Sequence, residues 1–166
     1  MKLRNIASAC ALAGLASTAS AIGVVTPLIA GQHTVIGEVL CAMNPATVPP
    51  SAPSGACAYD ITVPGWCLTE THLYVGANFP RNAAPGQFPY QTSGGCATDV
   101  IIPFKLSDVG LAACPATGSL VVMAHAVAAN RVTRQIETAW GSGPRTRLGG
   151  WSMSFSLSCA TPSGEN

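Results

Sequence analysis

Short runs of alternating apolar and polar residues, separated by proline and glycine, are the feature that most constrains the fold of this chain. In the run CAYDITV (57–63), the odd-numbered side chains are apolar or aromatic and the even-numbered ones include Asp60 and Thr62, which is the period of a β-strand. Further runs are read as strands at 33–43, 66–75, 99–104, 119–129, 134–141 and 151–159. Short strands at this spacing predict an all-β fold, a single antiparallel β-sandwich of Greek-key type with long loops.

The apolar run 119–129 (SLVVMAHAVAA) also admits a helical interpretation, because its alanines favour helix. Its valines and the period-two pattern of the neighbouring segments favour a central strand covered on both faces. The intervening stretches are rich in proline and glycine and are read as loops at 44–56, 76–95 and 105–118. The loop 76–95 is long enough to suggest a functional role.

Residues 1–21 have the three parts of a secretory signal peptide. Lys2 and Arg4 form a basic start, an apolar core follows that is too short to span a membrane, and small residues end at Ala21. A lipoprotein site at Cys10 is the alternative, but almost no apolar core would precede that cysteine. We therefore expect cleavage after Ala21 and a secreted, extracellular protein.

Cleavage leaves one domain, 22–159, followed by a polar tail, 160–166. The chain has eight basic and seven acidic residues, and two of the basic ones belong to the signal, so the mature protein is near neutral. A near-neutral chain is not expected to be drawn to nucleic acid or to anionic lipid. The mature chain has no apolar run long enough to cross a bilayer, so membrane insertion is not expected either.

The cysteines predict three disulfides. Without the cysteine of the signal, an even number remains, which in an exported chain is typical of disulfide bonding: Cys41, Cys57, Cys67, Cys96, Cys114 and Cys159. A zinc site is not favoured, because neither CxxC nor CxxH spacing occurs. Sequence leaves many pairings open, and of these we expect Cys41–Cys57, since the two cysteines flank the loop of a hairpin.

The segment WCLTETHLYVG (66–76) places Glu70 and His72 on one face of a strand, together with Leu68 and Tyr74. A histidine between two alanines and an isolated strand glutamate complete the candidate cluster, which is Glu70, His72, His125 and Glu137. We favour a hydrogen-bonded network that satisfies buried polar groups. The alternative is a zinc or copper site, since two imidazoles and one or two carboxylates suit these ions.

Acid–base catalysis by the same cluster is a third interpretation. The chain contains no GxSxG elbow, no HExxH pair and no glycine-rich phosphate loop. The sequence therefore favours a protein that is not an enzyme.

A second candidate region is basic. Most of the mature chain's basic residues fall between 131 and 151, at Arg131, Arg134, Arg145 and Arg147. Trp140 and Trp151 accompany them, and arginines with aromatic rings bind anionic polysaccharide by charge and stacking. The alternative is a solvated hairpin with two core tryptophans. In the loop 76–95, three aromatic residues are candidates for contact with a protein or glycan, or for pinning the loop to the sheet: Phe79, Phe88 and Tyr90.

Five motifs occur in one order along the chain: PLIAGQHTVIGEV, GWCLTETHLYVG, NAAPGQFPY, AHAV and ETAWG. As a set they resemble an uncharacterised extracellular β-rich domain of microbial secreted and cell-surface proteins. The resemblance covers most of the mature chain, implies an extracellular β-rich domain and supplies no catalytic residue. This chain has more cysteines and a longer loop at 44–56 than that pattern.

Together these observations predict a secreted, non-catalytic interaction or structural module that binds a cell-wall or matrix glycan or a surface protein. The alternative is a secreted metal-binding protein that uses the Glu/His cluster to hold zinc or copper, with hydrolysis as its reaction. No cofactor other than such an ion is expected.

Overall fold

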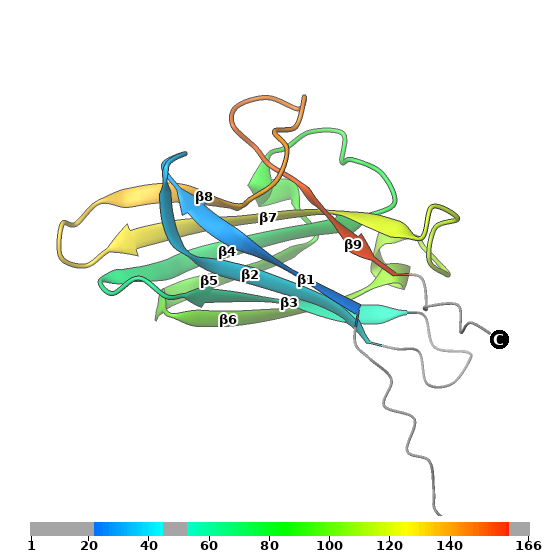
Figure 1. Cartoon of the computed structure of the whole chain (residues 1–166), viewed down its shortest axis with the longest axis horizontal. Coiled ribbons are helices and arrows are strands. Elements are labelled where there is room, and N and C mark those ends of the chain that lie inside the picture. Colours follow the sequence, from blue (N-terminus) through cyan, green and yellow to red (C-terminus); the bar gives the residue numbers. More distant parts are fainter. Residues whose placement is uncertain (1–21, 45–52, 160–166) are drawn as a thin grey trace, which may run out of the picture.

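The computed structural model describes residues 22–44 and 53–159 (Figure 1). These residues form strands β1 (Ile22–Ala30), β2 (Thr34–Asn44), β3 (Ser54–Ile61), β4 (Trp66–Gly76), β5 (Tyr90–Ala97), β6 (Asp99–Lys105), β7 (Ser119–Asn130), β8 (Ile136–Gly141) and β9 (Phe155–Ser158), with short 3-10 helices η1 (Pro85–Gln87) and η2 (Leu106–Val109). Neither helix in these ranges has the length or hydrophobicity of a membrane-spanning segment. The predicted signal peptide and polar tail lie outside the described residues.

All the strands belong to one antiparallel sheet. Their order is β5-β4-β7-β8-β1-β2-β3-β6, and β9 pairs with β7 outside this path. The sheet curls (Figure 1), and at its open seam the Tyr90 hydroxyl of β5 donates a hydrogen bond to the Lys105 carbonyl of β6 (3.0 Å). The result is a nearly closed barrel. The predicted all-β, antiparallel class is confirmed, but one curled sheet takes the place of the two facing sheets that a sandwich would have.

The predicted strands are present, although some are shorter than expected. The segment 119–129 is a strand, because alternate side chains of β7 are buried in the core. Two strands were not predicted: β1, and β5, which lies inside the predicted loop 76–95. β5 lacks an apolar alternation and is mostly exposed, so its conformation depends on pairing with β4.

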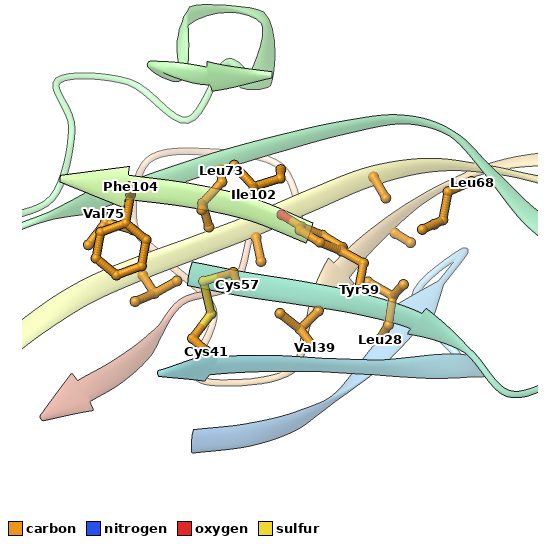
Figure 2. Close-up of a cluster of buried hydrophobic side chains, with 14 of the residues drawn as sticks. Leu28, Val39, Cys41, Cys57, Tyr59, Leu68, Leu73, Val75, Ile102 and Phe104 are labelled. Carbon is orange, nitrogen blue, oxygen red and sulfur yellow. A yellow bond between two sulfur atoms is a disulfide. The ribbon is translucent and has the colours of Figure 1, made fainter. Parts of the chain in front are cut away.

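Inward-facing apolar side chains from both halves of the sheet fill the barrel (Figure 2). The labelled members are Leu28, Val39, Cys41, Cys57, Tyr59, Leu68, Leu73, Val75, Ile102 and Phe104. The Tyr59 hydroxyl of β3 reaches across this core and donates a hydrogen bond to the His72 carbonyl of β4 (3.1 Å). The bond satisfies a buried polar atom and ties together two strands that are not neighbours in the sheet.

Three disulfides are formed, as predicted: Cys41–Cys57, Cys67–Cys96 and Cys114–Cys159. The first joins directly opposed residues of β2 and β3, which confirms the expected pair. The second joins β4 to β5, and the third ties the segment before β7 to the end of β9. Each therefore fastens segments that the sheet already brings together.

Candidate functional site

Two buried histidines meet on the outer face of the barrel. β4 and β7 pair with His72 directly opposite His125. A β-bulge between Leu68 and Glu70 turns Leu68 into the core with Leu73, while Glu70 and His72 stay on the outer face. The prediction that Leu68 shares a face with Glu70 is therefore wrong, because a bulge shifts the alternation by one residue.

The imidazoles of His72 and His125 share a hydrogen bond. Their Nδ1 atoms are 3.2 Å apart, so one ring donates its N–H to the unprotonated nitrogen of the other. The Nε2 atom of His72 lies 3.8 Å from Oε2 of Glu70, whose side chain is half exposed. The pair is thus a buried polar link between β4 and β7, with a carboxylate at its solvent edge.

Burial favours the neutral form of both rings. Desolvation, followed by the neighbouring His72 ring, lowers the pKa of His125 from 6.5 to about 3. Desolvation also lowers the pKa of His72, against the opposing effect of the Glu70 carboxylate. Two protonated rings would face each other with donors only and no acceptor. The shared hydrogen bond therefore requires that at least one imidazole remain neutral.

Aromatic side chains cover the histidine pair. Trp140 of β8 is the cross-strand neighbour of His125, and the ring centroids are 4.8 Å apart. Phe88 and Trp151 pack edge-on against Trp140, at 6.3 and 6.4 Å. We call the surrounding group the outer cluster; it comprises Phe88, Met123 and Trp140, with Tyr74, Ala83, Val121, Leu148, Trp151 and Met153 packed against them.

The outer cluster holds two long loops on the sheet. Phe88 belongs to the β4–β5 loop (77–89), and Trp151 belongs to the β8–β9 loop (142–154). The two loops rise on the same side of the barrel (Figure 1). Phe88 and Trp151 both pack on Trp140, and Trp140 in turn packs on His125. The histidine pair therefore lies beneath the base of both loops.

A pocket of about 270 Å³ lies between these loops. Its lining residues come from both of them: Phe79, Arg145, Thr146, Arg147 and Leu148. Phe79 is 52% exposed, so its ring is available at the pocket rim. The Arg145 guanidinium donates a hydrogen bond from Nη2 to Oε1 of Gln32 (3.0 Å), which fixes its position. The pocket thus combines an aromatic ring with two exposed guanidinium groups.

The four predicted arginines do not form one surface. Arg131 and Arg134 are exposed in the turn between β7 and β8. Arg145 and Arg147 lie in the β8–β9 loop and line the pocket. The predicted basic segment is therefore divided into a turn and a pocket wall.

The predicted loop aromatics also separate by role. Only Phe79 is strongly exposed. Phe88 is buried in the outer cluster, and Tyr90 bonds to the Lys105 carbonyl and to Asp108 at the barrel seam. Phe88 and Tyr90 thus pin the segment to the sheet, which is the alternative that the sequence left open.

Glu137 does not join the histidine pair. Glu137 is two residues from Ala139 on β8, so the two lie on the same face, and Ala139 faces the core. Trp140 lies on the opposite, outer face next to His125. Its Oε1 atom accepts a hydrogen bond from Nε2 of Gln135 (2.7 Å). In the described ranges, no three His, Cys, Asp or Glu side chains group closely enough to hold a metal ion.

Several site residues were not predicted. Thr146 and Leu148 stand between or beside the arginines, and Gln32 lies in the distant β1–β2 turn. Neutral residues of these types carry no functional signal in a single sequence. Comparisons with protein-family models, with curated proteins and with solved structures found no match to this chain.

Proposed function

We propose that this protein is a secreted, non-catalytic binding module whose ligand occupies the pocket between the β4–β5 and β8–β9 loops. One observation carries the proposal: two segments singled out separately in the sequence as binding elements line the same pocket. An exposed aromatic ring beside two guanidinium groups suits a ligand that has both a ring face and an anionic group. The three disulfides are in keeping with an extracellular setting.

The ligand that we infer is an acidic oligosaccharide of a cell wall or matrix. A guanidinium group binds a carboxylate through two parallel hydrogen bonds, and Arg145 is already held by Gln32. A sugar ring has an apolar face that packs against an aromatic ring such as Phe79. Since the mature chain is near neutral, local charge at the pocket has to supply the attraction.

The test is calorimetric titration with a galacturonic acid oligomer, with a neutral galactose oligomer of equal length as the control ligand. We expect the acidic oligomer to bind more weakly as salt is raised, and the neutral one to bind far less. Arg145→Gln or Arg147→Gln should each weaken binding roughly ten-fold, because a hydrogen bond to a charged group is lost.

Arg131→Gln together with Arg134→Gln is the matched control, because it removes the same charges from the distant turn. This variant should bind like the wild type. Equal affinity of the pocket variants and the wild type, or no binding of the acidic oligomer at all, would overturn the proposal.

A second candidate function is zinc or copper binding by His72 and His125. The observation that favours it is the approach of the two Nδ1 atoms to 3.2 Å. Two zinc–nitrogen bonds of about 2.0–2.1 Å at a tetrahedral angle would separate the nitrogens by about 3.3 Å. Glu70 beside the other ring nitrogen of His72 is the kind of carboxylate that orients a ligating imidazole. The ion would have to take its remaining ligands from water or substrate.

A further inference from the structure

The outer face of β1, β2, β3 and β6 presents two adjacent apolar rows, set by the strand register. One row is Val25, Leu40, Ala58 and Ile101, and the next is Gly23, Ala42, Ala56 and Pro103. Val25, Leu40 and Ile101 are 56%, 44% and 67% exposed. A contiguous exposed apolar patch of this kind is a candidate interaction surface.

Polar rows of different character border the patch on its two sides. Next to the row of large side chains, Glu38, Asp60 and Asp99 stand directly opposite one another on β2, β3 and β6. Carboxylates aligned in this way repel one another and destabilise a sheet that faces only water. Next to the row of small side chains stand hydrogen-bond donors: Asn44, Ser54 and Lys105.

We propose that this face binds the same face of a second copy in a two-fold symmetric dimer. A two-fold axis in the interface plane, perpendicular to the strands, places each strand over its own counterpart and reverses its direction. Asp99 of one copy then faces Lys105 of the other, and Asp60 faces Ser54. The same operation sets the row of large side chains over the row of small ones, so the two faces interdigitate as packed sheets do.

Charge complementarity favours a second copy of this chain as the partner of the face. A face with carboxylates on one border and donors on the other is complementary to itself after this rotation. A basic foreign protein would neutralise the acidic row but would meet Lys105 at the other border. The self-paired arrangement satisfies both borders at once.

The expected association is weak. Four strands at about 4.8 Å and four rows at about 6.8 Å give a face of roughly 500 Å². Stable complexes bury about 800 Å² on each partner, so a dissociation constant on the order of 100 μM is expected. Self-association of this face is independent of the proposed glycan pocket, which lies in other loops.

The test is sedimentation equilibrium of the purified protein from about 10 μM to about 1 mM, a range that brackets the expected dissociation constant. We expect a monomer–dimer equilibrium. Asp99→Lys and Lys105→Glu should each weaken it about ten-fold, since each places like charges opposite one another at two symmetric positions. An equimolar mixture of the two variants should restore the dimer, because both opposed pairs are then of opposite sign.

Arg131→Glu, a similar charge reversal outside the face, is the matched control and should dimerise like the wild type. Ile101→Arg should abolish the dimer without unfolding the monomer, because the replaced side chain is exposed. Circular dichroism checks the fold of every variant. A wild type that stays monomeric over the whole range, or a mixture of variants that fails to recover the dimer, would overturn the proposal.

Discussion

Lowering the pH from 7.5 to 5.0 should destabilise the folded protein by about 2 kcal/mol through His125 alone. The pKa of this imidazole is about 3 in the folded state and near the ordinary value of 6.5 in the unfolded chain. The unfolded chain therefore takes up a proton first, and acid favours unfolding. Because the folded pKa is the lower one, this contribution is present in full above about pH 6.5 and is lost as the pH falls toward 3.

The magnitude follows from the distance between the pH and the unfolded pKa. Each unit below 6.5 costs about 1.36 kcal/mol while the folded imidazole remains neutral, so pH 5.0 costs about 2 kcal/mol. The result does not depend on the folded pKa as long as that value lies well below 5. His72, whose pKa is also lowered by burial, contributes in the same direction, with Glu70 acting against it.

The assay is guanidinium unfolding with the disulfides intact, followed by intrinsic fluorescence at pH 7.5, 6.0 and 5.0. Over this range, His125→Gln should lose about 2 kcal/mol less stability than the wild type, because the titrating group is gone. His33→Gln, in the exposed turn between β1 and β2, controls for the loss of one histidine. If the wild type and His125→Gln lose stability in parallel, the reasoning is refuted.

Three further predictions concern the core, a disulfide and the histidine pair. Tyr59→Phe removes the donor to the His72 carbonyl and should lower the free energy of unfolding by about 1–2 kcal/mol in the same assay. An unchanged free energy of unfolding would show that this hydrogen bond adds no stability. Replacing Cys41 and Cys57 together by alanine should lower the free energy of unfolding by at least roughly 3 kcal/mol, as expected for a closed loop of this size. A double variant as stable as the wild type would contradict this prediction. If the histidine pair is only a hydrogen bond, zinc, copper or a chelator should shift the melting temperature by less than about 1 °C. Stoichiometric metal that disappears in His125→Gln would instead support the metal site.

Local sequence pattern predicted the strands well where one face of a strand meets the core. In 57–63 the odd-numbered side chains pack in or against the core, and this period of two is visible in the sequence itself. In 119–129 both faces are covered around Met123 and His125, and the sequence shows a continuous apolar run instead. β5 carries no such period: its adjacent glycines and polar residues become a strand only because β4 is there to pair with. The choice between two sheets and one curled sheet depends on pairings such as β1 with β8, which no local pattern encodes.

The candidate site was predictable in its residue types but not in its geometry. His72 and His125 meet because of the register of β4 on β7, and a shift of one residue would put them on opposite faces. Glu137 was grouped with the two histidines because of its carboxylate alone. Its position in β8 places it on the face opposite to Trp140 and the histidine pair. The pocket forms because two loops far apart in the chain pack on one tryptophan, and no local sequence pattern encodes that contact.

The most direct test of the binding proposal is amide chemical-shift mapping by NMR during titration with a galacturonic acid oligomer. We predict that the amides of Phe79 and of residues 145–148 shift together and saturate with a single dissociation constant. The turn that carries Arg131 and Arg134 should remain unperturbed. Shifts confined to that turn, or no shifts in the β4–β5 and β8–β9 loops, would contradict a glycan site between them.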